Sequence, residues 1–94
     1  QASAAYVSVT EDTALTNAHA GKALLVGADA VLTFGALDDG AEIEIWNTGS
    51  YTVTVSGALF AAGEGSKTRC ALDAYSVCAV KKMNGVLYVS GGVS

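Results

Sequence analysis

The chain has 94 residues and a mass of 9.4 kDa, so it has room for one hydrophobic core, and residues 1–94 are treated as one domain. Hydrophobic residues make up 51% of the chain and charged residues 15%, which excludes a disordered chain and indicates that a partner covers part of its apolar surface. The net charge of −4, with scattered basic residues, argues against nucleic-acid binding. No apolar run approaches the roughly 20 residues of a membrane-spanning helix, so no membrane insertion is expected.

The chain begins with Gln1 rather than Met, and the residues that follow lack the basic start and long apolar run of a signal peptide. We therefore expect a fragment, the C-terminal part of a longer protein. The 11 glycines, the absence of proline and the short runs rich in Val, Ile, Thr and Tyr are typical of many short strands joined by tight turns.

The first part of the chain holds three weaker strand candidates, residues 5–10, 22–26 and 30–34. Residues 12–20 lie between the first two candidates. Their apolar residues do not form a sustained stripe at helical spacing, so they allow at most one helical turn.

Residues 41–56 contain the clearest alternation of apolar and polar side chains. Two alternating runs flank Asn47-Thr48-Gly49-Ser50, which predicts an antiparallel hairpin with one buried face. Trp46 falls on the polar side, with the glutamates, and is expected to be exposed or covered by a partner. The inward positions of this hairpin are Ile43, Ile45, Val53 and Val55.

A second hairpin is predicted at residues 66–82, with its turn near residue 74. Cys70 and Cys78 are equally far from this turn and would lie opposite each other on one face. A disulfide between them is one candidate. Buried thiols are favoured, because a cytosolic setting keeps thiols reduced and cross-strand bridges demand particular geometry.

The last turn is predicted at Asn84-Gly85, since Asn-Gly supplies the positive φ angles of a type I′ turn. Residues 86–89 then return as the closing strand, and residues 90–94 are expected to be a flexible tail. Together these elements predict an all-β fold, a small antiparallel sandwich or barrel of about eight short strands.

Catalytic chemistry is not indicated by any motif. His19 is the only histidine and lies in a polar stretch without a nucleophile elbow, which argues against a catalytic triad. The two cysteines lack the spacing of a zinc site. We predict no enzyme activity, no catalytic residue, no metal site and no cofactor.

Four carboxylates lie close together in the sequence and could suit an acid/base pair or a calcium site. Two of them belong to an ordinary Asp-Asp-Gly turn and two occupy solvent-facing strand positions, so a solvated face is the favoured interpretation. They are Asp38, Asp39, Glu42 and Glu44.

Exposed aromatic side chains suit a sugar-binding platform, because aromatic faces stack on sugar rings. Packing in a core or an interface is the favoured interpretation, since small sheet proteins need aromatics there. The aromatic residues in question are Trp46, Tyr51, Phe60 and Tyr75.

The sequence resembles small β domains of bacteriophage tail fibres, tailspikes and related virion proteins. The resemblance rests on Gly-Ala-Glu-Ile-Glu-Ile-Trp-Asn-Thr-Gly at residues 40–49, on Tyr-Thr-Val-Thr-Val at residues 51–55, and later on Leu72, Asn84-Gly85 and Tyr88-Val89. It covers roughly residues 13–91 and is a pattern of alternation and turns rather than a catalytic signature.

The resemblance implies a homotrimer, assembled into a virion in the host cytoplasm, that forms the tip of a fibre or spike and attaches to the host surface. The implied partners are other copies of the chain, other virion proteins, and a host glycan or outer-membrane protein. The alternative is a capsid decoration, cement or head-fibre domain that contacts only other virion subunits. Solvent-exposed strand faces and loop tips commonly make recognition contacts. On this basis we expect the contact residues to be Trp46, Asn47, Tyr51, Phe60 and Glu64.

Overall fold

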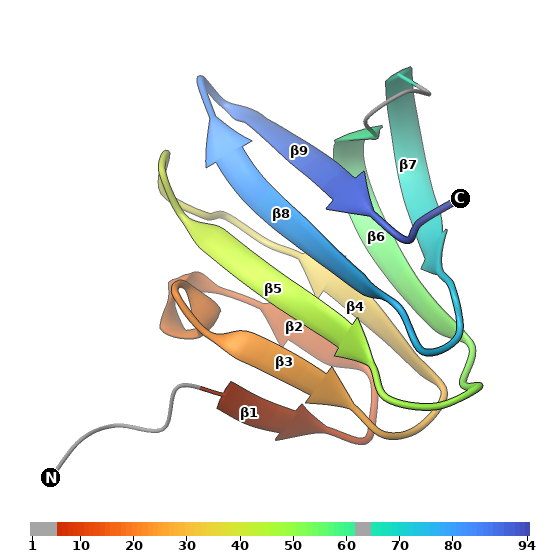
Figure 1. Cartoon of the computed structure of the whole chain (residues 1–94). Coiled ribbons are helices and arrows are strands. Elements are labelled where there is room, and N and C mark those ends of the chain that lie inside the picture. Colours follow the sequence, from red (N-terminus) through yellow and green to blue (C-terminus); the bar gives the residue numbers. More distant parts are fainter. Residues whose placement is uncertain (1–5, 62–64) are drawn as a thin grey trace, which may run out of the picture.

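The structure is a computed structural model that describes residues 6–61 and 65–94. Within those residues the fold is all-β, as predicted, with nine strands rather than about eight and one short 3-10 turn, η1 (Figure 1). The elements are β1 (Tyr6–Val9), β2 (Thr13–Leu15), η1 (Asn17–His19), β3 (Ala23–Val26), β4 (Ala30–Phe34), β5 (Glu42–Asn47), β6 (Val53–Ala61), β7 (Gly65–Leu72), β8 (Val77–Met83) and β9 (Val86–Gly91).

The nine strands form one sheet that folds over into two facing layers and nearly closes into a barrel. The order is β1-β3-β5-β8-β9-β6-β4-β2, and β7 pairs with the free side of β6. The first six strands alternate between layers, so that β1, β3 and β5 lie parallel in one layer and β2, β4 and β6 lie parallel in the other (Figure 1). The chain therefore winds through three stacked coils before its last three strands begin.

The predicted hairpin over residues 41–56 is wrong in its pairing and right in its faces. Strands β5 and β6 lie in opposite layers, and β5 pairs with β3 and β8 instead. Ile43, Ile45, Val53 and Val55 are all buried, and they face one another across the core. Alternation determines which face of a strand is buried and does not determine which strand lies beside it.

The predicted hairpin over residues 66–82 is also wrong. Strand β7 pairs antiparallel with β6, whereas β8 lies between β5 and β9 in the other layer. The Asn84-Gly85 hairpin is confirmed: Met83 pairs with Val86, and the φ angles of Asn84 and Gly85 are 53° and 77°. The sheet is thus mixed rather than antiparallel.

Strand β6 joins the two layers because it bends. The pairing register shifts between Ser56 and Leu59, where Gly57 has a φ of 147° that favours glycine. Before the bend β6 pairs with β4, and after it residues 59–61 pair with β9. This bend closes one side of the barrel and leaves β1 and β2 as the two ends of the strand order.

The expected flexible tail at residues 90–94 is instead part of the fold. Strand β9 continues to Gly91, and the amide of Asp73 donates to the carbonyl of Gly92 at 2.8 Å. Ala71 and Ser94 exchange two backbone hydrogen bonds of 3.0 Å each. The tail closes the gap between β7 and β8, which lie in different layers.

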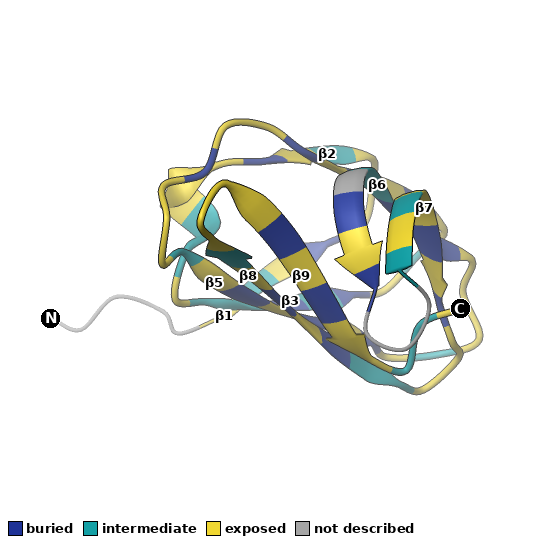
Figure 2. Cartoon of the chain, turned by 90° about the horizontal axis from the view of Figure 1, so that it is seen from above, coloured by how far each residue is buried: buried dark blue, intermediate teal, exposed yellow. Residues whose placement is uncertain are grey.

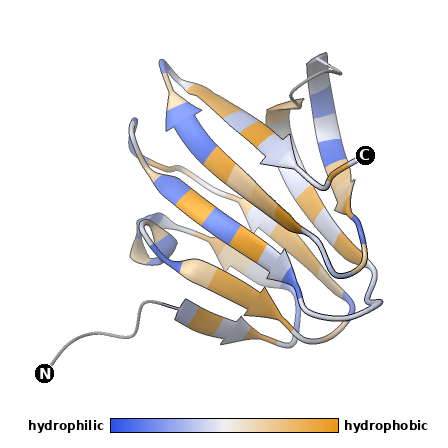
Figure 3. Cartoon of the chain, viewed as in Figure 1, coloured by the Kyte–Doolittle hydropathy of each residue, from blue (hydrophilic) through white to orange (hydrophobic). Residues whose placement is uncertain are grey.

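Buried and exposed residues alternate along the strands of both layers (Figure 2), and hydrophobic and hydrophilic residues alternate along β5 in the same way (Figure 3). The inward residues form one continuous core of aliphatic side chains, Phe34 and both cysteines. In the part of the chain that the structure describes, no helix is long and apolar enough to cross a membrane.

Candidate functional site

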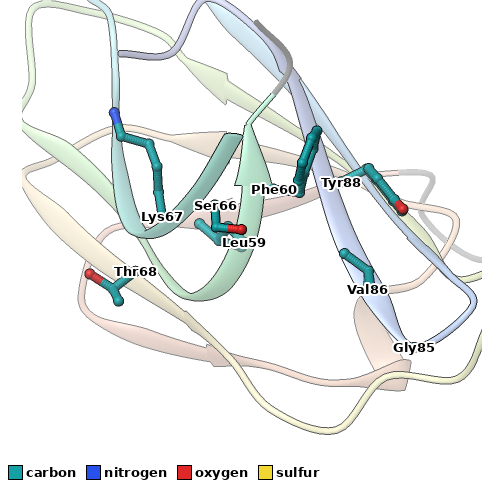
Figure 4. A pocket seen from close by; sticks show the side chains of 8 residues that line it. All are labelled: Leu59, Phe60, Ser66, Lys67, Thr68, Gly85, Val86 and Tyr88. Atoms are coloured by element: carbon teal, nitrogen blue, oxygen red, sulfur yellow. The ribbon is translucent and has the colours of Figure 1, made fainter. Parts of the chain in front are cut away.

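A groove lies where the β6–β7 pair meets the tip of the β8–β9 hairpin (Figure 4). In the strand order this is the β9–β6 junction, in the middle of the sheet, whereas β1 and β2 are its two ends. Its volume is about 800 Å³, within the range of small-molecule sites. The described residues that line it are Leu59, Phe60, Ser66, Lys67, Thr68, Gly85, Val86 and Tyr88.

An aromatic pair forms one side of the groove. The ring centroids of Phe60 and Tyr88 are 5.4 Å apart, and the rings are tilted by 58°. Phe60 is 41% exposed and Tyr88 is 37% exposed, so both rings remain open to solvent after they pack on each other. Exposed rings in this arrangement offer apolar faces to a ligand and, through the Tyr88 hydroxyl, one polar group.

The strand register extends this pair into a cross-strand row. Phe60 lies opposite Ser66 of β7 and Tyr88 of β9, Tyr88 lies opposite Lys81 of β8, and Lys81 lies opposite Glu42 of β5. All five are exposed. Because directly paired residues project from the same face of a sheet, the row runs across five adjacent strands on the outer surface.

The row ends in an ion pair. The Lys81 ammonium is 3.9 Å from a carboxylate oxygen of Glu42, and both side chains are well exposed. Glu44, two residues farther along β5, accepts a hydrogen bond from the indole N–H of Trp46. Lys81 is the positively charged residue of the row and lies opposite Tyr88, and Glu42 partly neutralises its charge.

Charge is unevenly distributed between the coils and the last strands. Residues 6–56 contain seven acidic residues and one basic residue, Lys22, whereas residues 57–94 contain four basic residues and two acidic ones. The four basic residues lie on β7 and β8, on either side of the β6–β9 seam: they are Lys67, Arg69, Lys81 and Lys82. Most of the basic residues thus lie on the strands near the groove, where the described carboxylates are Asp39 at the Gly85 amide and Glu42 at Lys81.

The structure places the nominated contact residues in different environments. Phe60 lines the groove, whereas Trp46 and Tyr51 are exposed away from it. Glu64 lies outside the described residues. Asn47 is only 1% exposed, and its side chain binds the carbonyls of Tyr51 and Leu72, so its nomination as a surface contact is wrong.

Tyr88 and Lys81 were missed as site residues, although a signal for them was present. The Asn84-Gly85 turn fixes the register of the last hairpin, and counting outward from it places Lys81 opposite Tyr88 on the outer face. The neighbour on the other side, Phe60, follows from a parallel pairing between distant strands, which no local pattern indicates.

Cys70 and Cys78 are buried thiols that no disulfide joins. They do not face each other in a hairpin, because β7 and β8 lie in different layers, and they approach instead across the core. Burial raises the pKa of the Cys78 thiol to about 12, and the neighbouring Cys70 adds to the shift. Such a thiol carries almost no reactive thiolate at neutral pH.

The other titratable candidates hold local structure. The His19 ring nitrogen Nδ1 accepts a hydrogen bond from the Thr16 amide at 3.0 Å, at the start of η1. The Asp39 carboxylate accepts the amide of Gly85 at 3.0 Å. A search of the described residues for three or more His, Cys, Asp or Glu side chains that could hold a metal ion found none. No protein-family model matches this sequence, and a search of curated proteins gave no match.

Proposed function

We propose that this chain is a non-enzymatic structural domain of a bacteriophage virion, the trimeric tip of a fibre or spike, and that its grooved end contacts the host surface. The observation that carries the proposal is the position of the groove: it lies among the last strands, at the β9–β6 junction in the middle of the sheet, away from the two end strands β1 and β2. The proposal also rests on the sequence resemblance to small virion β domains.

The coils suit a fibre because they stack along one direction. Strands β1 and β2 each pair with one described neighbour, β3 and β4, so their outer edges offer backbone groups to a further strand. Attachment at these edges would leave the groove pointing away from the fibre.

An oligomer would cover exposed apolar side chains on the outer face of the first layer. Tyr6 and Trp46 project from β1 and β5 on that face, away from the groove, and both are substantially exposed. Closed symmetry is the usual way in which such surfaces are covered in soluble assemblies.

Two measurements test this function. Light scattering on a size-exclusion column should give a mass three times that of the 9.4 kDa chain, and fluorescently labelled protein should adsorb to some members of a panel of bacterial strains. A trimer that adsorbs to no strain, yet binds isolated capsids, would replace host attachment by capsid decoration. A stable monomer would remove the fibre-tip assignment.

A further inference from the structure

We propose that the cross-strand row binds an acidic oligosaccharide laid across the strands, with its rings on Phe60 and Tyr88 and a carboxylate on Lys81. This inference rests on the proposed function and names the ligand class of the same site. The row of Ser66, Phe60, Tyr88, Lys81 and Glu42 supplies the geometry.

The spacing of the row suits a linear oligosaccharide. Neighbouring strands in a sheet lie about 4.8 Å apart, which is similar to the length of one sugar ring in such a chain. Successive rings would therefore meet successive side chains: the Ser66 hydroxyl, the two aromatic rings and then Lys81. Hydroxyls for the edges of the sugars and flat apolar faces for their C–H surfaces are both present.

The charge of the site favours an anionic sugar over a neutral one. The described lining of the groove contains Lys67 and no carboxylate, and the last strands carry most of the basic residues of an otherwise acidic chain. The Lys67 stem lines the groove while its ammonium extends away from the aromatic pair (Figure 4), so Lys81 is the cation placed to meet a carboxylate above Tyr88.

The ion pair between Glu42 and Lys81 predicts opposite effects on ligand binding for substitutions of its two partners. The Glu42 carboxylate holds Lys81 at 3.9 Å and would compete with the carboxylate of a ligand for the same ammonium. Removing the Glu42 charge should therefore strengthen binding, whereas removing the Lys81 charge should weaken it. If the ion pair only stabilised the strands, removing either charge would change binding in the same direction.

The test is titration calorimetry of the full chain with tetragalacturonate as the acidic probe and maltotetraose as the neutral one. We expect Tyr88→Thr and Lys81→Gln each to weaken tetragalacturonate binding about tenfold, and Glu42→Gln to strengthen it about threefold. Tyr6→Thr, at an exposed position of β1 on the same face of the sheet and outside the row, is the matched control and should leave affinity unchanged. Circular dichroism of each variant verifies the fold.

Equal affinity for the two probes, or effects of Lys81→Gln and Glu42→Gln in the same direction, would overturn the inference. Adsorption to bacterial cells separates this failure from failure of the proposed function. Wild-type protein that adsorbs to cells, together with a Tyr88→Thr variant that adsorbs equally well, keeps host attachment and removes this site. Loss of adsorption in Tyr88→Thr and Lys81→Gln, with gain in Glu42→Gln, supports both.

Discussion

Asn47 is the one polar residue among the described residues that is buried, and it holds the crossing between the two layers. Its amide donates to the carbonyl of Tyr51 at 2.8 Å and to that of Leu72 at 3.3 Å, and its side-chain oxygen accepts the amide of Gly49. One side chain therefore satisfies three backbone groups at the point where β5 ends. A buried polar group with all of its partners specifies a turn more strictly than an apolar residue would.

Replacing Asn47 with leucine should destabilise the fold by about 3 kcal/mol, because it removes the amide donor from a buried and a part-buried carbonyl at nearly unchanged volume. Urea unfolding followed by tryptophan fluorescence measures the change. Ser50→Ala, at an exposed position in the same crossing, is the control and should change stability little. An Asn47→Leu variant as stable as the wild type would show that water replaces the amide.

The raised pKa of Cys78 makes stability depend on alkaline pH. An unfolded cysteine loses its proton near pH 9.0, whereas burial keeps Cys78 protonated in the folded chain up to about pH 12. The free energy of unfolding that the buried, protonated Cys78 thiol contributes is fully present below pH 9. It is lost as the pH rises from 9 toward 12, by about 1.4 kcal/mol per pH unit. Removing this thiol should therefore cost less as the pH rises.

We expect the difference in unfolding free energy between wild type and Cys78→Ala to shrink between pH 9 and pH 11. Urea titrations of both proteins at several pH values measure it, and the comparison cancels the titration of lysines and tyrosines that the two proteins share. Parallel curves for the two proteins would mean that the thiolate is tolerated in the core.

At the scale of elements, the end of β9 is fixed by a close approach of backbones. Gly91 has a φ of 121°, and a Cβ atom there would lie 2.8 Å from the Cα of Cys78 and closer still to the carbonyl oxygen of Val77. Glycine at this position lets the tail lie against β8 and then reach β7. Because glycine has more backbone freedom than other residues, the sequence alone predicts a flexible tail here.

Gly91→Ala should destabilise the fold by at least about 3 kcal/mol, since it adds a steric overlap with backbone to the cost of a positive φ. Gly85→Ala isolates the second term, because Gly85 also has a positive φ but has open space at its Cβ position; it should cost about 1 kcal/mol. Thermal unfolding of both variants gives the comparison. Equal losses in the two variants would contradict the close packing at Gly91.

At the scale of the whole molecule, the strands differ in how many neighbours they have. Strand β5 lies between β3 and β8, and β8 lies between β5 and β9, whereas β1 and β2 each pair with one described strand. Local opening needs fewer broken hydrogen bonds at the ends of the strand order, so stability should decrease from the centre of the sheet toward β1 and β2.

Hydrogen exchange measured by mass spectrometry should therefore show fast exchange in β1 and β2 and the slowest exchange in β5 and β8. In a trimer whose interface covers Tyr6 and Trp46, β1 would instead be protected, and dilution to monomer would restore its fast exchange. Uniform protection at every concentration would contradict the gradient.

Sequence patterns alone predict the all-β class, the inward residues of β5 and β6, the outward position of Trp46 and the last hairpin. Each of these follows from alternation or from Asn-Gly turn chemistry, which act between residues close in the chain. Tertiary packing sets the three-coil winding, the mixed sheet, the docked tail and the meeting of Phe60 with Tyr88. They depend on which strands become neighbours, and an alternating strand satisfies its buried face equally well beside several partners, so long-range packing makes that choice.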